Sequence, residues 1–166
     1  PGRVGRRAGL ARYRAVMAER ARDGGWSTRE PEQAREALLA VRLLVLDVDG
    51  VLTDGSVNYL GAEELQSFHV RDGQGLVWLQ RVGIELAWIS GRGALATELR
   101  AKELGIRHLY LRCSDKEACL SELQTNLRLT PAVTIAMGDD LVDLGLAARA
   151  ALLPPSIWSR GVDNAL

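Results

Sequence analysis

The chain has 166 residues and a mass of 18.1 kDa, the size of one domain that can bury its own core. Hydrophobic residues make up 47% of it and charged residues 25%, which excludes a disordered, fibrous or collagen-like chain. The net charge is zero, no apolar run is long enough to span a bilayer, and the Arg-rich start lacks the apolar core of a signal peptide, so we expect a cytoplasmic protein without membrane partners.

The first 42 residues form a basic segment, with ten Arg against five acidic residues, whereas residues 43–166 have eleven basic against sixteen acidic residues. Helices are predicted over residues 8–22 and from Pro31 to about Ala40. Acidic residues are interleaved with the arginines, which favours a solvated helix face or linker over a nucleic-acid-binding arm. We therefore predict an N-terminal arm at 1–40 and a main domain at 41–166, with no nucleic-acid partner. The start at Pro1 rather than Met fits a fragment or a processed chain.

The main domain begins with the run VRLLVLDVDGVL from Val41, which is typical of a buried parallel strand. Further strands are predicted at 84–90, 108–111 and 133–137, and they alternate with helices at about 94–104, 115–127 and 141–149. This alternation predicts an α/β fold with a parallel sheet covered on both faces. Between Thr53 and Val70, apolar and polar residues alternate around a Gly-containing turn, which predicts a β-hairpin.

Polar residues follow each predicted strand, where ligands collect in open α/β sheets. The four segments are Asp47-Val48-Asp49-Gly50, Ser90-Gly91-Arg92, Ser114-Asp115-Lys116, and Gly138-Asp139-Asp140 with Asp143 beyond it. Carboxylates this close repel one another unless a cation lies among them, and hard oxygen ligands suit Mg²⁺.

Asp47 and Asp49 have the spacing that places both side chains on one side of an ideal strand. Where the strand gives way to a loop, one of them can instead offer its backbone carbonyl. One carboxylate could attack an electrophile and form an acyl phosphate, and the second could act as general acid and base. Lys116 and the backbone amides around Ser90 and Gly91 could balance the charge of a phosphoryl group in transfer.

These segments resemble, in order, the four motifs of the haloacid dehalogenase superfamily of phosphatases: DVDGVLTDG from Asp47, Ser90-Gly91-Arg92, Lys116, and GDDLVD from Gly138. More narrowly, the segment from His69 to Gly75 and the stretch from Leu104 to Tyr110 are similar to the 3-deoxy-D-manno-octulosonate 8-phosphate phosphatase family. The resemblance covers about Val41 to Ala150 and implies a Rossmann-like three-layer sandwich of the capless type with a β-hairpin insertion.

The resemblance also implies roles for single residues. Asp47 would be the nucleophile and a metal ligand, and Asp49 the acid/base, binding Mg²⁺ through its carbonyl. Asp139 would complete the metal site, with Asp140 and Asp143 in support, and Ser90 and Lys116 would hold the phosphoryl oxygens. The residues facing a phosphorylated sugar-acid substrate would be His69, Val70, Arg71, Asp72, Gly73, Gly91, Arg92 and Arg100.

The family further implies an enzyme of lipopolysaccharide biosynthesis and a homotetramer in which the hairpin, Ser56 to Phe68, helps to close a neighbour's active site. After Ala150 the sequence departs from the family, whose members continue through a further sheet element, a Gly-rich segment and a last helix. This departure concerns substrate closure and tetramer contacts, and it leaves the acids of the first strand untouched.

Several alternatives remain open from the sequence. A related phosphatase could act on a nine-carbon keto-deoxy sugar phosphate, the chain could be a non-catalytic assembly domain, and a phosphoacceptor receiver domain ranks last because both key acids here follow one strand. Asp139 and Asp140 could cap a helix, and Arg92 and Arg100 could be surface residues. Cys113 and Cys119, six residues apart, indicate no disulfide framework and are expected to be buried thiols.

Overall fold

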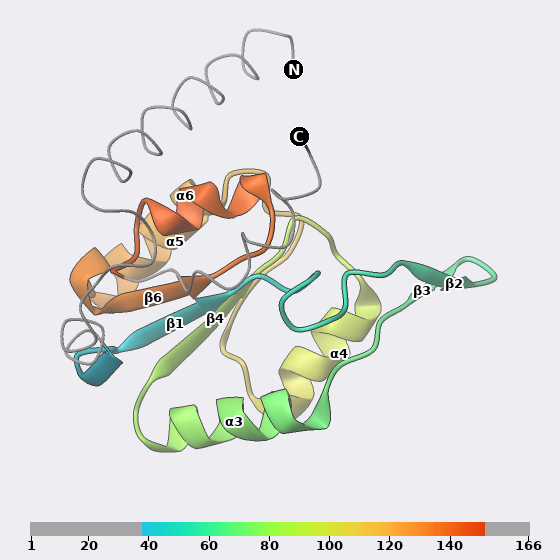
Figure 1. The fold of residues 1–166 in the computed structure, drawn as a ribbon, viewed down its shortest axis with the longest axis horizontal. Helices are drawn as coiled ribbons and strands as arrows, with labels where there is room; N and C mark the ends of the chain where they lie inside the picture. Colours follow the sequence, from blue (N-terminus) through green and yellow to red (C-terminus); the bar gives the residue numbers. More distant parts are fainter. Residues whose placement is uncertain (1–37, 152–166) are drawn as a thin grey trace, which may run out of the picture.

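The computed structural model describes residues 38–151. The predicted helix over 8–22, most of the one over 31–40 and the chain after residue 151 lie outside the described residues. Within residues 38–151, no helix is long and apolar enough to cross a membrane. A parallel sheet with helices on both faces forms the centre, which confirms the predicted fold class (Figure 1).

Among the described residues, the sheet contains four parallel strands in the order β5-β4-β1-β6. The strands are β1 (Leu43–Leu46), β4 (Glu85–Ile89), β5 (His108–Tyr110) and β6 (Thr134–Met137). Each lies within a predicted strand, because short, nearly continuous apolar runs are what a sheet buried on both faces requires. The first strand is central, with β4 on one side and β6 on the other.

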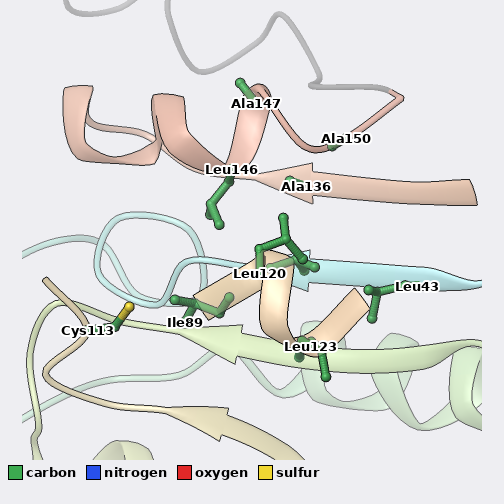
Figure 2. Close-up of a cluster of buried hydrophobic side chains, with 11 residues drawn as sticks. Leu43, Ile89, Cys113, Leu120, Leu123, Ala136, Leu146, Ala147 and Ala150 are labelled. Carbon is green, nitrogen blue, oxygen red and sulfur yellow. The ribbon is translucent and has the colours of Figure 1, made fainter. Parts of the chain in front are cut away.

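Helices cover both faces of this sheet (Figure 1). Helices α5 (Lys116–Leu127) and α6 (Leu144–Ala147) lie on one face, and α3 (Val70–Arg81) and α4 (Leu95–Leu104) on the other. Side chains alternate along each strand, so Leu43 and Val45 pack under α5 and α6, whereas Leu46 packs on the opposite side. Two separate apolar clusters result, and Figure 2 shows the one beneath α5 and α6.

Local signals fix several helix ends. Asp115 caps α5 by accepting a hydrogen bond from the Ala118 N–H, and Gly105 ends α4 in the left-handed conformation at φ 69°. The predicted helix at 141–149 is a 3₁₀ turn, η2 (Leu141–Asp143), followed by the single turn of α6, and a second 3₁₀ turn, η1 (Pro131–Val133), precedes β6. Helix α3 was not predicted, because its two glycines and exposed Trp78 obscure the apolar pattern.

The predicted hairpin is present as β2 (Asn58–Leu60) and β3 (Glu63–Leu65), which form an antiparallel two-stranded sheet. Gly61 adopts φ 62° in the tight turn, a backbone conformation that glycine accommodates without strain. The hairpin projects from the body of the domain (Figure 1), and Tyr59 and Leu60 at its end are exposed.

Burial predicts where substitutions destabilise the fold. Leu120 is fully buried between α5 and the sheet, so Leu120→Ala is expected to lower the free energy of unfolding by about 2–5 kcal/mol. Leu99 on α4 is 59% exposed, and Leu99→Ala should change it by less than about 0.5 kcal/mol. Urea denaturation of both variants measures the difference, and equal effects would contradict this account of the core.

Candidate active site

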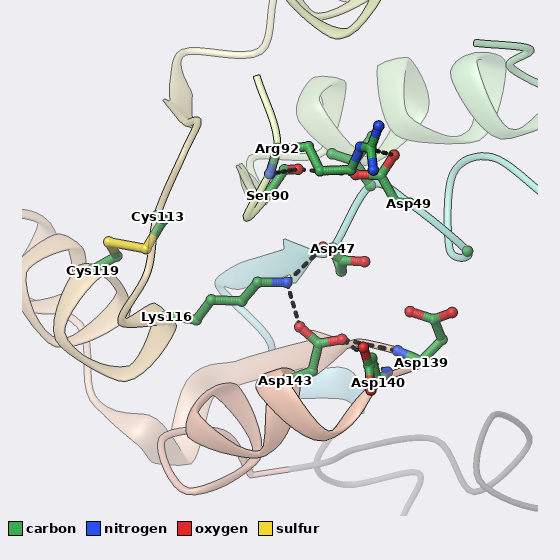
Figure 3. A network of polar contacts seen from close by, with 12 residues as sticks. Asp47, Asp49, Ser90, Arg92, Cys113, Lys116, Cys119, Asp139, Asp140 and Asp143 are labelled. Atoms are coloured by element: carbon green, nitrogen blue, oxygen red, sulfur yellow. Dashed lines mark hydrogen bonds and ion pairs between the residues drawn. A yellow bond between two sulfur atoms is a disulfide. The ribbon is translucent and has the colours of Figure 1, made fainter. Parts of the chain in front are cut away.

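The carboxyl ends of three strands meet at one edge of the sheet. Leu46, the last residue of β1, pairs with Trp88 of β4 and with Met137 of β6, so the three strands end at nearly the same level. The residues that follow them bring Asp47, Ser90 and Asp139 to this edge (Figure 3). This is the convergence predicted from the sequence.

A buried lysine lies between two carboxylates at the centre of this edge. Lys116 Nζ donates to Asp47 Oδ1 at 2.6 Å and to Asp143 Oδ1 at 2.5 Å (Figure 3). All three side chains are nearly excluded from solvent. Lys116 is the first residue of α5, so the Asp115 cap that begins this helix positions the backbone from which the ammonium group reaches the two carboxylates.

Asp143 joins this ion pair to the turn after β6. Its second oxygen, Oδ2, accepts hydrogen bonds from the backbone N–H groups of Asp139 and Asp140 at 3.0 and 3.1 Å. A Cβ at Gly138 would overlap Asp143, and one at Gly50 would overlap the Asp139 carboxylate. The carboxylates of Asp143 and Asp139 are therefore packed directly against the backbone, which restricts their positions.

The electrostatics of the cluster favour an additional cation. Burial and the charge of Asp143 raise the pKa of Asp47 to about 6, although Lys116 acts in the opposite direction. Burial lowers the pKa of Lys116, but the bonds and charges of Asp143 and Asp47 outweigh it and raise the pKa overall. Partial burial and the charge of Asp143 also raise the pKa of Asp139. A single ammonium thus compensates the acids incompletely.

The oxygen donors fit a hard divalent cation. One carboxylate oxygen each from Asp47, Asp139 and Asp143 lies within 4.8 Å of the others. With all three ionised and Lys116 protonated, the group has a net charge of −2, which a divalent ion would balance. Carboxylate oxygens are the donors that Mg²⁺ and related hard cations prefer. Of the two acids expected to support Asp139, Asp143 belongs to this group, whereas the Asp140 carboxylate caps η2 by accepting the Leu141 N–H.

Asp49 belongs to a second group of contacts. The backbone leaves strand geometry after Leu46 and turns at Gly50, which has φ 93°. The side chains of Asp47 and Asp49 therefore have different partners and do not share one group of contacts as they would on an ideal strand. The Asp49 carboxylate accepts from Ser90 Oγ at 3.0 Å and from Gln66 Nε2 at 2.8 Å. Thr97 Oγ1 in turn donates to Gln66 Oε1 at 2.6 Å.

The predicted substrate-facing residues lie on α3, on α4 and after β4. Arg92 pairs with Glu64 of the hairpin at 2.8 Å, which raises the Arg92 pKa, and its Nε lies 3.9 Å from Asp49 Oδ1. The Arg100 guanidinium, paired with Glu103, passes so close to Gly73 that a Cβ there would meet it. His69 caps α3, and its ring accepts the Arg71 N–H at 3.2 Å. Val70, Arg71, Asp72 and Gly91 are exposed, whereas Gly73 is buried.

Three residues of this region were missed by the sequence analysis. In the sequence, Glu64 and Gln66 are polar positions of the predicted hairpin and Thr97 is part of a predicted helix, and nothing indicates a role at the site. Their contacts depend on the path of the chain between β1 and α3, for which no motif exists.

The expectation of buried thiols was wrong. Cys113 and Cys119 form a disulfide, with their Cα atoms 7.1 Å apart (Figure 3). Spacing alone did not reveal it, because the pairing depends on how the chain enters α5 after β5, where Arg112 has the left-handed φ of 53°. The bridge closes the segment that contains Lys116.

The chain is similar in sequence to phosphatases from several bacteria. No protein-family model matches the chain. It is 45% identical over 114 residues to the 3-deoxy-D-manno-octulosonate 8-phosphate phosphatase KdsC of Yersinia pestis and 44% identical over 114 residues to that of Escherichia coli K12. Each match covers 68% of this chain and 60% of the relative, so the chain spans less than two thirds of these relatives' length.

Several solved structures are similar to this chain in both fold and sequence. The 3-deoxy-D-manno-octulosonate 8-phosphate phosphatase of Moraxella catarrhalis, in complex with magnesium, phosphate and KDO, matches with a TM-score of 0.70 and 36% identity, over 73% of this chain and 70% of that one. The cobalt-bound enzyme of Haemophilus influenzae matches with a TM-score of 0.68 and 36% identity, over 70% and 69%. A structure from Legionella pneumophila described as a HAD-superfamily (subfamily III A) hydrolase matches at 0.68 with 34% identity, over 75% and 72%.

The raised pKa of Asp47 predicts a pH dependence of stability. An acid with a pKa of about 6 when folded and 3.8 when unfolded binds more protons in the folded state between these values. The metal-free protein should therefore lose stability as pH rises from about 4 to 6, by up to about 3 kcal/mol from this residue. Urea denaturation across this range should show a smaller loss for Asp47→Asn than for the wild type. The exposed control Glu98→Gln should follow the wild type, and identical curves for Asp47→Asn would contradict the assignment.

Proposed function

The chain belongs to the 3-deoxy-D-manno-octulosonate 8-phosphate phosphatase family of the haloacid dehalogenase superfamily, and we propose that it is a Mg²⁺-dependent phosphatase acting on 3-deoxy-D-manno-octulosonate 8-phosphate. The observation that carries the proposal is the buried Asp47 carboxylate at the end of β1, held by Lys116 beside Asp139 and Asp143. This arrangement would combine a nucleophile, a fixed positive charge and a set of oxygen donors in one place.

In the proposed reaction, Asp47 is the nucleophile. An oxygen of its carboxylate attacks phosphorus, the bond from phosphorus to the sugar oxygen breaks, and Asp49 gives a proton to that oxygen as it leaves. Asp49 then takes a proton from a water molecule that attacks the phosphoryl group on Asp47. This second step releases inorganic phosphate and restores both carboxyl groups. Water is the only co-reactant.

The acidic residues would hold the metal ion. Asp47, Asp139 and Asp143 offer carboxylate oxygens, Asp49 could add its backbone carbonyl, and Asp140 is next to the site. When bound, Mg²⁺ supplies positive charge that lets an anionic nucleophile approach an anionic phosphoryl group. Lys116 would remain in contact with Asp47 and keep it oriented.

Other polar groups would bind the substrate. Ser90 Oγ, the backbone N–H of Gly91 and the ammonium of Lys116 are candidates for the phosphoryl oxygens. Arg92, Arg100 and the segment from His69 to Gly73 would face the sugar acid, whose carboxylate suits guanidinium partners. Arg92 is already beside Asp49, which supports this part of the proposal.

The proposal extends to assembly and pathway. The hairpin has exposed apolar side chains at Tyr59 and Leu60, which supports a homotetramer in which it helps to close a neighbouring site. The reaction would be a step of lipopolysaccharide biosynthesis. Residues 41–166 would form the phosphatase domain, preceded by the arm at 1–40.

Phosphate release tests the proposed function directly. The chain should hydrolyse 3-deoxy-D-manno-octulosonate 8-phosphate faster than other sugar phosphates when Mg²⁺ is present, and EDTA should abolish turnover. A preference for a nine-carbon keto-deoxy sugar phosphate would correct the substrate. If folded, Mg²⁺-loaded protein hydrolysed none of them, the chain would be better described as an assembly domain without catalysis.

Two substitutions separate the proposed roles of the first-strand acids. Asp47→Asn should abolish turnover, because the amide is not a nucleophile, and Asp49→Asn should lower kcat by about 10²- to 10⁴-fold, because it removes the acid/base. Colorimetric phosphate assays measure both. Circular dichroism checks that each variant is folded, and retained turnover in Asp47→Asn would refute the nucleophile assignment.

A further inference from the structure

The hydrogen bonds of Gln66 connect the base of the hairpin to the proposed acid/base. Gln66 directly follows β3 and is half-buried. Its Nε2 donates to Asp49 Oδ1 at 2.8 Å, and its Oε1 accepts from Thr97 Oγ1 at 2.6 Å. Thr97 is 2% exposed on α4, so its hydroxyl is a fixed rather than a mobile partner. A chain of polar contacts thus runs from α4 through the hairpin to the loop after β1.

The chemistry of the groups determines which of them donates each hydrogen bond in this series of contacts. A carboxylate only accepts hydrogen bonds, so the amide nitrogen of Gln66 must face Asp49 and its oxygen must face Thr97. The hydroxyl of Thr97 is then the donor. On the other side, Ser90 Oγ accepts the Arg92 N–H at 2.9 Å and donates to Asp49 Oδ2 at 3.0 Å. Each oxygen of the Asp49 carboxylate therefore has its own oriented donor.

We propose that Gln66, oriented by Thr97, is a positioning residue that holds the Asp49 carboxylate for its work as general acid and base. The inference rests on the proposed function. A carboxylate with one fixed donor can still rotate about its side-chain bonds, whereas donors on both oxygens define its plane. Ser90 is also a candidate for contact with the phosphoryl group, so Gln66 is the donor that remains with Asp49 when substrate enters.

The leaving group provides a test that a general loss of structure would not reproduce. A sugar alkoxide needs the proton of Asp49 to leave, whereas p-nitrophenolate leaves readily without one. We expect Gln66→Leu to slow the first turnover of 3-deoxy-D-manno-octulosonate 8-phosphate by roughly 10- to 100-fold. With p-nitrophenyl phosphate, Gln66→Leu should slow the burst of p-nitrophenolate by less than about threefold. Asp49→Asn should also slow this burst by less than about threefold, because the leaving group needs no proton.

Thr97 supplies a second and smaller perturbation. Thr97→Val keeps the shape of the buried side chain but removes the donor, and it should show the same selectivity between the two substrates with a smaller loss. Thr97→Ser keeps the hydroxyl and should recover most of the rate that Thr97→Val loses. Thr125→Val makes the matching change on α5, where the hydroxyl donates only to the Ser121 carbonyl, and should leave both rates unaltered.

Non-additivity completes the test. In the Asp49→Asn background, Gln66→Leu should cause little further loss, because the carboxylate that it positions is already gone. Equal slowing of both substrates by Gln66→Leu, or additive losses in the double variant, would overturn the inference while leaving the proposed function intact. A wild type that cleaves neither substrate would overturn the proposed function itself, and the inference with it.

Discussion

The contact of Lys116 with Asp47 and Asp143 is the interaction on which the arrangement of the acids depends. The two carboxylates follow different strands, and packing of the sheet and helices brings them together at a place that water barely reaches. Without the ammonium, two buried negative charges would oppose that packing, and removing one partner of a buried ion pair typically costs about 3–5 kcal/mol. Because Lys116 offsets only part of the negative charge, the same packing that stabilises the fold maintains an attraction for a further cation.

The two groups of polar contacts lie on opposite sides of the sheet edge. Asp47 meets Lys116 and Asp143 from the layer of α5 and α6 (Figure 3). Asp49 instead meets Gln66 at the base of the hairpin and Ser90 after β4, and Thr97 of α4 reaches it only through Gln66. The proposed nucleophile and the proposed acid/base are thus supported by different layers of the protein. This separation explains how two acids that are neighbours in sequence can have different environments and different proposed tasks.

Much of the fold was predictable because its signals are local. The four strands and α4 were located from apolar runs and Gly105, and α5 from its helical pattern after β5, where Asp115 provides the cap. Helix α3 was not, because its glycines and exposed apolar residues conceal the burial pattern. The site divides in the same way, because the strand ends predicted that the acids would gather at one edge of the sheet. The carboxylate oxygen that Asp143 contributes to the acidic group, the hydrogen bonds of Gln66 and the disulfide depend instead on the paths of loops, which a linear pattern does not encode.

The alternation along β1 sets how this segment tolerates change. Leu43 and Val45 point toward α5 and α6, as does Asp47 beyond them, and Leu46 points the other way. Replacing one of these leucines or valines with another apolar residue would alter only the quality of packing. Inserting or deleting a single residue would exchange the two faces and turn the carboxylate away from Lys116. The number of residues before Asp47 is therefore constrained more strictly than their identity.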